Sequence, residues 1–257
     1  MRPPVVVSIA GSDPSGGAGL QADLRTCTVL GAYAGAIPTC ITVQDTEGVR
    51  RVDSLAGELV RAQIDLVLAD LRPGAVKIGL LPSVEVVEAV AEGLAAYGST
   101  PIVLDPVQVA TSGDALSPAS AYAALIELLL PRATLVTPNL AEAASLAGFR
   151  VEEAQDFERA ARAIRARGAR AVLVKGGHLD GDALDLLLTG DERVELRAPR
   201  IPGPPIHGTG CTLSTAIAVH LARGDALVPA VRAAKEWIGG RIAAAVRIGR
   251  GAAVLPP

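Results

Sequence analysis

Residues 157–178 read FERAARAIRARGARAVLVKGGH, and this stretch indicates the fold of the chain. Its apolar side chains recur at the spacing i, i+3, i+4 and i+7, which forms one face of an α-helix: Phe157, Ala160, Ala161 and Ile164. Gly168 follows, and glycine commonly ends a helix. The aliphatic run 171–174 comes next, with the length and composition of a buried strand. The stretch therefore predicts a helix that leads directly into a strand.

The same alternation continues along the rest of the chain. Further short aliphatic or β-branched runs lie at 5–9, 35–43, 76–78, 102–104 and 135–136. Between them, Ser83 is a suitable cap for a helix closed by Gly98, and Ser117 with Pro118 suits the start of another that ends near Pro131. Strands alternating with helices predict an α/β fold with a mainly parallel sheet covered on both faces. Because no linker, low-complexity tract or repeat interrupts the pattern, we expect a single domain over residues 1–257.

The composition excludes several classes of protein. Half of the 257 residues are hydrophobic, but only 2% are aromatic, so aliphatic side chains must fill the core. The formal net charge of −3 gives no basic surface for nucleic acid or an anionic membrane. We find no apolar run long enough to span a bilayer and no signal peptide. The odd number of cysteines and their spacing fit no metal site or Cys-x-x-Cys redox pair and suit a reducing cytoplasm: Cys27, Cys40 and Cys211.

Polar residues follow three of the expected strands: Asp105, Thr137 with Asn139, and Lys175. A fourth strand, 76–78, contains Lys77 and runs into Gly79. In an open parallel sheet, ligands bind at the carboxyl ends of the strands, so the polar residues, together with the glycine-rich stretch after His207, are expected to line one crevice. Each residue alone is also typical of an ordinary turn. Lysine is scarce, with three among 24 basic residues, so Lys77 and Lys175 are of interest as retained point charges.

The stretch 207–212, HGTGCT, predicts a site for an anion. The residues after it, 213–219, suggest a helix, and the start of a helix presents free N–H groups and a partial positive charge. A phosphate would fit there, and the same field would lower the pKa of the Cys211 thiol. The alternative is an ordinary glycine-rich loop with a buried cysteine.

A second glycine-rich stretch, 9–23, reads IAGSDPSGGAGLQAD and follows the first expected strand. Its glycines allow the backbone to approach a ligand closely, although a surface loop has the same composition. The chain has no Gly-Lys pair, so the stretch is not a P-loop, and it lacks the glycine spacing of a dinucleotide site.

Six blocks together resemble the hydroxymethylpyrimidine/phosphomethylpyrimidine kinase family of thiamine biosynthesis. They follow the family's order over roughly residues 5 to 245, and they lie at 10–23, 77–79, 105–107, 137–143, 175–178 and 207–212. The resemblance implies a ribokinase-like fold, a three-layer α/β/α sandwich around a mainly parallel sheet. It also implies a homodimer.

The resemblance implies two ATP-dependent phosphorylations at one site. The first acts on 4-amino-5-hydroxymethyl-2-methylpyrimidine, and the second extends the monophosphate to the diphosphate. Phosphoryl transfer has a loose, charge-rich transition state, which N–H groups would stabilise. The resemblance assigns these groups to Gly208, Thr209, Gly210 and Cys211, and the Cys211 thiolate is expected to accept the hydroxyl proton.

The resemblance also assigns residues to each ligand. Gln44 is expected to read the pyrimidine ring, because a carboxamide complements an amine beside a ring nitrogen. The expected pocket residues around it are Gly11, Asp23, Leu80 and Val107. The nucleotide is assigned to Asn139, Lys175 and Thr209, and Mg²⁺ to Asp105 and Glu142.

Four positions depart from the family pattern. The family usually has Met where Leu80 and Gln108 stand, Asn at Asp45 and often Lys at Thr111. These changes bear on the second phosphorylation and on the preference for a pyrimidine. Two alternative functions remain open, a pyridoxal kinase and a non-catalytic pyrimidine-binding sensor.

Overall fold

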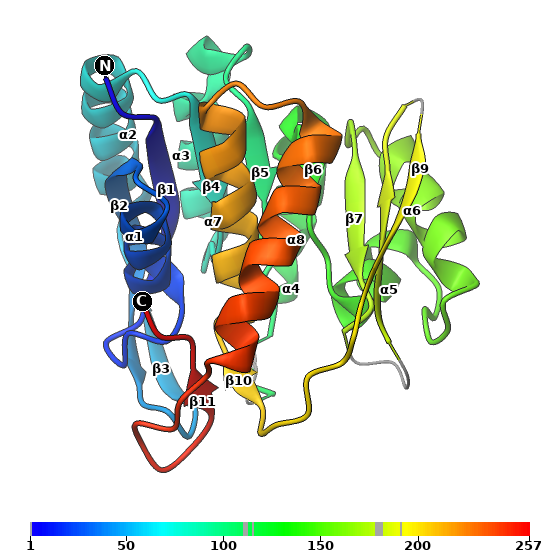
Figure 1. Ribbon diagram of the computed structural model, residues 1–257. Helices are drawn as coiled ribbons and strands as arrows, with labels where there is room; N and C mark the ends of the chain where they lie inside the picture. Colours follow the sequence, from blue (N-terminus) through cyan, green and yellow to red (C-terminus); the bar gives the residue numbers. More distant parts are fainter. Residues whose placement is uncertain (1, 110–112, 115, 178–181, 191) are drawn as a thin grey trace.

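The computed structural model describes residues 2–109, 113–114, 116–177, 182–190 and 192–257. In this part of the chain a nine-stranded sheet has the order β3-β2-β1-β4-β5-β6-β7-β8-β9 (Figure 1). In sequence order the strands are β1 (Val5–Ser12), β2 (Tyr33–Gln44), β3 (Val49–Ser54), β4 (Ala75–Ile78), β5 (Ile102–Leu104), β6 (Leu135–Val136), β7 (Val172–Lys175), β8 (Ala183–Leu188) and β9 (Arg193–Ala198). A separate parallel pair joins β10 (Ile206–His207) to β11 (Ala253–Val254).

The centre of the sheet is parallel and its two edges are antiparallel. Six neighbouring strands pair in parallel, in the order β2, β1, β4, β5, β6 and β7. The strands β3, β8 and β9 each run antiparallel to the strand before them in the chain. All the parallel strands therefore end at the same edge of the sheet, which is the edge where ligands bind in folds of this type.

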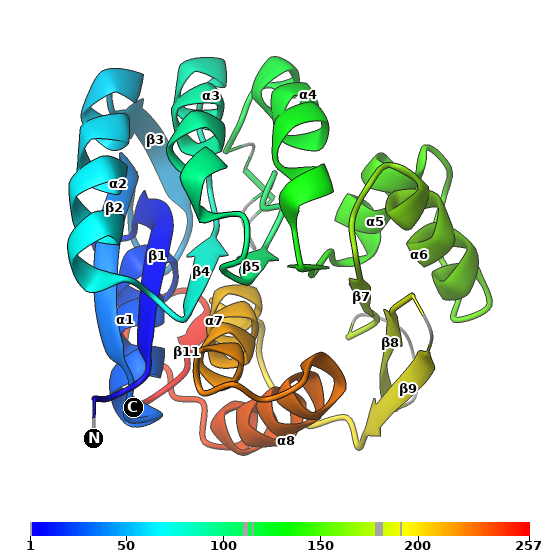
Figure 2. The same cartoon turned by 90° about the horizontal axis from the view of Figure 1, so that it is seen from above.

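Helices cover both faces of the sheet (Figure 2). One face carries α2 (Gly57–Leu71), α3 (Val84–Gly93), α4 (Ala119–Leu128), α5 (Leu140–Ala147) and α6 (Asp156–Ala166). The other carries α1 (Gly19–Val29), α7 (Thr209–Ala222) and α8 (Leu227–Ala243). Two short 3₁₀ turns follow α3 and α4, at Ala95–Tyr97 and Leu130–Arg132. None of the described helices is long and apolar enough to cross a membrane.

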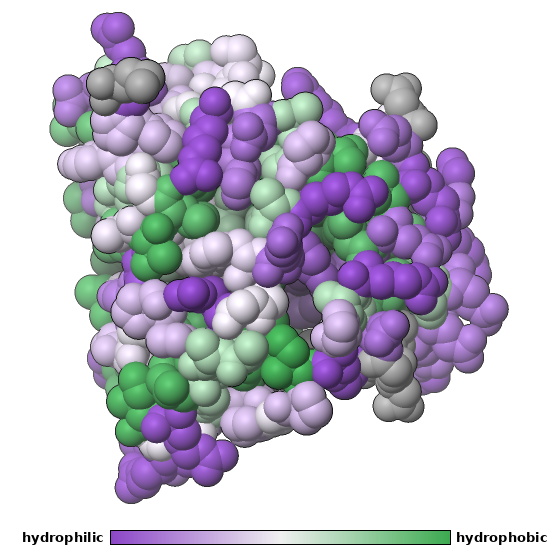
Figure 3. All heavy atoms as spheres, in the orientation of Figure 1, coloured by the Kyte–Doolittle hydropathy of each residue, from purple (hydrophilic) through white to green (hydrophobic). Residues whose placement is uncertain are grey.

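Alternate residues of each central strand pack into two separate cores. Val7 and Val76 are buried against the α2–α6 layer, and their neighbours Val6 and Ala75 against the layer of α1, α7 and α8. This is why the parallel strands are apolar on both faces. Charged side chains gather instead around β9 and α6, where Figure 3 shows a largely hydrophilic surface, among them Arg162, Arg193 and Arg197.

The predicted fold class is confirmed. Each strand expected from the sequence is present, and the expected helices appear as α3, α4, α6 and α7. Ser83 caps α3 by accepting the Val86 N–H, and Gly168 follows α6 with a positive φ of 113°. The helix expected from residue 213 begins earlier, at Thr209, so residues 209–212 of HGTGCT form its first turn, while His207 lies in β10 and Gly208 is the N-cap.

Candidate active site

Three of the functional residues expected from the sequence meet where the parallel strands end: Asp105, Lys175 and Gly210. Lys175, the last residue of β7, donates from Nζ to Asp105 Oδ1 over 3.1 Å. A Cβ placed on Gly210 would lie 3.2 Å from Lys175 Nζ and 3.5 Å from Asp105 Oδ2. Thr137, which follows β6, donates to Asp105 Oδ1 over 3.0 Å. The first turn of α7 therefore faces the strand ends.

Glycine is required where the two glycine-rich segments touch. Gly208 caps α7 with a φ of 81°, and a Cβ there would lie 1.9 Å from Gly17 O. The hydrogen bonds of α7 begin with Thr212 N–H to Gly208 O, at 2.9 Å. The N–H groups of residues 209–211 precede that bond, so this turn has the geometry of an anion cradle.

Cys211 is the third residue of α7 and is partly exposed. Burial raises the pKa of its thiol to about 11, and the carboxylates Asp23 and Asp105 add to that shift. Lys77 and the Gly19 N–H act in the opposite direction. The prediction that the helix start lowers this pKa is wrong for the ligand-free protein, because the loss of solvation outweighs the nearby positive charge.

Asp23 lies beneath the site, not in its wall. Its side chain is 1% exposed and makes a 2.8 Å ion pair with Lys77 Nζ, which is 0% exposed. Its other oxygen accepts the Thr215 hydroxyl over 2.7 Å, and the Ser8 hydroxyl donates over 2.5 Å. The expectation that Asp23 lines the pyrimidine pocket is therefore corrected, since its carboxylate is buried and fully engaged.

Asn139 and Glu142 hold the start of α5 through a capping box. Asn139 Oδ1 accepts the Glu142 N–H over 2.9 Å, and Glu142 Oε2 accepts the Asn139 N–H over 2.8 Å. Burial raises the pKa of Glu142 to about 7, while Lys175 opposes the shift and Asp105 adds to it. Both residues thus have structural roles beside the site, and their predicted roles with nucleotide and metal stay predictions.

The described residues contain no group of three or more His, Cys, Asp or Glu side chains placed to hold a metal ion. Asp105 and Glu142 nevertheless suit Mg²⁺, which commonly takes one or two protein carboxylates and completes its shell with phosphate and water oxygens. Asp105 Oδ2 faces Gly210 and has only a long 3.5 Å contact from the Ser214 hydroxyl. One carboxylate oxygen therefore remains for such an ion.

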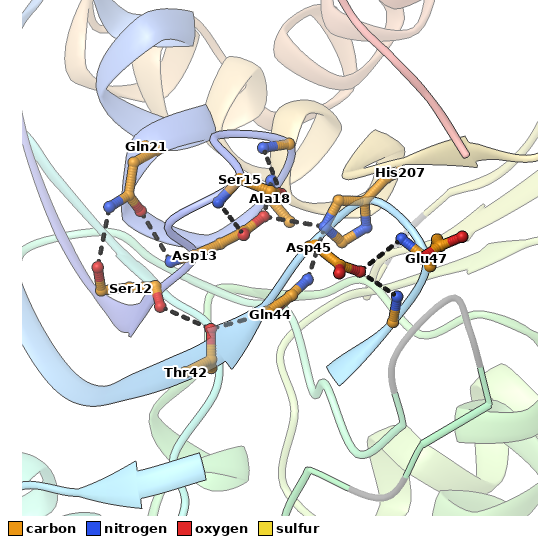
Figure 4. Close-up of polar contacts among 12 residues, drawn as sticks. Ser12, Asp13, Ser15, Ala18, Gln21, Thr42, Gln44, Asp45, Glu47 and His207 are labelled. Atoms are coloured by element: carbon orange, nitrogen blue, oxygen red, sulfur yellow. Dashed lines mark hydrogen bonds and ion pairs between the residues drawn. The ribbon is translucent and has the colours of Figure 1, made fainter. Parts of the chain in front are cut away.

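Gln44 ends β2 and lies beside His207, which precedes the first turn of α7 (Figure 4). The register of β2 shifts between Val43 and Gln44, and such a bulge re-aims a side chain. The Gln44 amide lies 2.9 Å from His207 Nε2, which is also 2.9 Å from Asp13 Oδ2. A cavity of about 440 Å³ opens beside it, lined by Pro14, Ser15, Gln44, Asp45, Thr46, Glu47, Ile248, Gly249 and Arg250.

The remaining predicted pocket residues lie in two places. Gly11 lies in β1 at the point where the pairing of β1 with β2 shifts register. A Cβ placed on Gly11 would lie 3.2 Å from Leu80 Cδ2. Leu80 is buried, and Val107 is half-buried after β5. Of the departures from the family pattern, Asp45 binds Arg50 over 2.8 Å and the Glu47 N–H, so it holds the β2–β3 turn. Thr111 lies outside the described residues.

Sequence reasoning missed several contributors to the site. Asp13 was noted only as part of the stretch 9–23 and His207 only as part of HGTGCT, and Thr42 carries no motif, yet all three lie in the hydrogen-bond network around Gln44. The carboxyl-terminal residues that line the cavity, Ile248 to Arg250, also gave no signal. Their roles depend on contacts between segments far apart in the chain, which local patterns do not encode.

Comparison with known proteins gives a consistent result. A family model described as phosphomethylpyrimidine kinase matches residues 13–255. A hydroxymethylpyrimidine/phosphomethylpyrimidine kinase of Streptomyces coelicolor is 49% identical over 98% of this chain and 93% of that protein. A chloroplastic thiamine biosynthetic bifunctional enzyme of Arabidopsis thaliana is 42% identical over 91% of this chain and 46% of its own length.

Two solved structures are closely similar. A pyridoxal kinase of Bacillus subtilis, solved as an ADP complex, has a TM-score of 0.92 at 33% identity and covers 98% of this chain and 97% of its own. A phosphomethylpyrimidine kinase from Clostridium difficile has a TM-score of 0.83 at 38% identity and covers 93% of this chain and 99% of its own.

Proposed function

The chain belongs to the phosphomethylpyrimidine kinase family, and we propose that its phosphoryl transfers take place at the first turn of α7. The enzyme phosphorylates 4-amino-5-hydroxymethyl-2-methylpyrimidine and its monophosphate in thiamine biosynthesis, with ATP as the donor. The observation that carries the proposed location is the position of Gly210 against both Lys175 and Asp105. A cradle of N–H groups, a cation and a carboxylate there suit a transferring phosphoryl group.

We assign the substrate hydroxymethyl group to the space in front of Cys211. In the transfer, the hydroxyl oxygen forms a bond to the γ-phosphorus, the bond from that phosphorus to the ADP oxygen breaks, and the hydroxyl proton passes to sulfur. The thiolate is the form that accepts the proton. Lys77 and the Gly19 N–H both favour that form, although burial holds the pKa of the free thiol near 11.

We assign the nucleotide phosphates to Lys175, Asn139 and Thr209, and a Mg²⁺ ion to Asp105 with Glu142. When bound, the ion would neutralise charge on the phosphate oxygens. Lys175 is already held at the cradle by Asp105, so little side-chain ordering is needed when phosphate binds. Gln44 with Gly11, Leu80 and Val107 would form the pyrimidine pocket.

A coupled assay of ADP release tests the proposal. We expect turnover with the pyrimidine alcohol and then with its monophosphate, and loss of turnover in EDTA that excess Mg²⁺ restores. Faster turnover of pyridoxal would favour the second candidate, which the similarity to the Bacillus subtilis pyridoxal kinase supports. No ADP release with any of these substrates would indicate a non-catalytic sensor.

We also propose, from the family resemblance, that the enzyme is a homodimer in the cytoplasm. Sedimentation equilibrium of the purified enzyme measures the first point, and a mass equal to the chain's 26.1 kDa would contradict it.

A further inference from the structure

The orientation of the Gln44 side-chain amide follows from the protons that surround it. Gln44 Nε2 lies 2.9 Å from His207 Nε2, and Gln44 Oε1 lies 3.1 Å from the Thr42 hydroxyl oxygen (Figure 4). The oxygen and the NH₂ group of a carboxamide have nearly the same size and shape, so the hydrogen-bond network decides which of them takes each position.

Asp13 fixes a proton on His207 Nε2. Asp13 is 3% exposed, and its Oδ2 lies 2.9 Å from that nitrogen. The N–H groups of Ser15 and Ala18 also donate to this carboxylate, at 2.9 and 2.8 Å. Hydrogen bonds from His207, Ser15 and Ala18 outweigh burial and lower the pKa of Asp13. An ionised carboxylate can only accept, so His207 Nε2 must donate to it.

Two contacts of the Gln44 amide do not fit the available protons, one at His207 and one at Thr42. A ring nitrogen that carries hydrogen has no lone pair in the ring plane, so it cannot accept from the Gln44 NH₂ group. On the other side, Thr42 has a single hydroxyl proton and also lies 3.0 Å from Ser12 O, a carbonyl that can only accept. Ser12 O and Gln44 Oε1 therefore compete for that one proton.

Turning the Gln44 amide by 180° removes the contact between two donors at His207 and the competition at Thr42. The carbonyl oxygen then shares the His207 Nε2–H with Asp13 Oδ2 in a three-centre hydrogen bond, and the NH₂ group donates to Thr42 while Thr42 donates to Ser12 O. We infer that His207, held by Asp13, is a positioning residue that fixes the Gln44 carbonyl on the α7 side and its NH₂ group on the β1 side. The inference about the substrate rests on the proposed pyrimidine pocket.

The fixed amide selects one pattern of hydrogen bonding. After its bonds to His207 and Thr42, Gln44 keeps one acceptor position and one N–H beside each other. A 4-aminopyrimidine offers an amine donor next to a ring-nitrogen acceptor, which this pair complements. The 4-oxo analogue offers an acceptor next to a ring N–H, the reverse pattern. A site built to pair one pattern rejects its reverse, because buried polar groups are left unpaired.

Two variants at position 207 test the inference with a matched control. His207→Leu removes the donor, and His207→Gln keeps an N–H donor near the place of Nε2. We compare kcat/KM for the 4-amino alcohol and its 4-oxo analogue. His207→Leu is expected to reduce the amino-to-oxo ratio about tenfold or more, because the freed amide can rotate to read either pattern. His207→Gln is expected to restore most of the ratio, and the KM for ATP is expected to change less than twofold in both.

A structural role alone would lower kcat/KM for both substrates equally and leave the ratio unchanged, and that result would overturn the inference. Thermal melting of both variants shows whether they fold, which matters because the His207 ring packs against Gly17.

A measurement on the free enzyme tests the proton placement whatever the substrate is. The chain has three histidines, so ¹⁵N NMR of their rings is simple, and His207→Gln assigns the signals of His207. We expect a proton on Nε2. An Nε2 without a proton would overturn the inference even if the kinase activity is found, and a protonated Nε2 would support it even if the enzyme phosphorylates another ring.

Discussion

At the scale of single residues, Cys211 lies where a base for the proposed transfer is needed, but its thiol pKa is too high for much thiolate to form near neutral pH. It lies in the first turn of α7, yet burial raises its pKa to about 11. From the sequence, Cys211 is expected just before a helix that begins at residue 213, and the structure places it inside the first turn of that helix. The sequence could not predict the pKa shift, because burial depends on how closely α1 and β4 pack against this turn.

Replacement of Cys211 by alanine should affect the rate of phosphoryl transfer but not the affinity for ATP. Cys211→Ala is expected to lower kcat by about 10²- to 10⁴-fold, the usual worth of a general base, while the Kd for ATP stays within about threefold. Single-turnover kinetics and calorimetric titration measure the two effects. Turnover of the variant at the wild-type rate would show that the thiolate is not the base.

The raised pKa predicts how Cys211 reacts with an alkylating reagent. Only the thiolate reacts, so iodoacetamide labelling should be slow at pH 7 and should rise about tenfold per pH unit toward the pKa of about 11. The pH dependence of kcat/KM should rise in the same direction. Peptide mass spectrometry measures labelling at Cys211 specifically, and a rate that is already constant above pH 7 would contradict the shift.

At the scale of secondary-structure elements, the start of α5 has a structural and a predicted functional task. The sequence identified Asn139 as a strand-end residue for nucleotide. It did not identify the reciprocal bonds with Glu142, although Asn three residues before Glu is a known sign of a capping box. The antiparallel strands β8 and β9 were also missed, although β9 alternates polar and apolar residues and the sequence Gly-Asp at 190–191 is a turn signal between them.

Two variants of Asn139 distinguish its helix-capping role from its proposed role in nucleotide binding. Asn139→Ala should lower the free energy of unfolding by about 1 kcal/mol through loss of the cap, whereas Asn139→Asp keeps an acceptor and should lose less. If the amide also binds nucleotide, both variants should weaken ATP binding, and the Asp variant more strongly because it repels phosphate. Urea unfolding and ATP titration measure the two quantities. Equal ATP affinity in all three proteins would leave Asn139 with a capping role only.

At the scale of the whole molecule, one buried polar cluster joins the central sheet to the layer of α1, α7 and α8. Asp23 in α1 binds Ser8 of β1, Lys77 of β4 and Thr215 of α7. The other two lysines make the same kind of contact, Lys175 with Asp105 and Lys235 with Asp185. The sequence marked lysine as scarce and therefore interesting, but only the fold reveals that every lysine neutralises a buried aspartate.

Removal of the Asp23 carboxylate should therefore destabilise the entire domain. Asp23→Leu leaves the Lys77 ammonium buried without a partner and should lower the free energy of unfolding by about 3–5 kcal/mol. Thr215→Val removes one neutral donor to the same carboxylate and should lower it by about 1 kcal/mol. Chemical denaturation compares them. If Asp23→Leu lowers the free energy of unfolding no more than Thr215→Val does, the ion pair between Asp23 and Lys77 contributes little to stability.

The short pairing of β10 with β11 gives the carboxyl-terminal residues an influence on substrate choice. His207 lies in β10, directly opposite Val254 of β11. Deletion of residues 253–257 would release the strand that carries His207, and with it the tether on Gln44. We expect the truncated enzyme to discriminate poorly between amino and oxo rings while still melting cooperatively. We therefore expect residues 253–257 to influence which pyrimidine the enzyme accepts, because they hold in place the strand that carries His207.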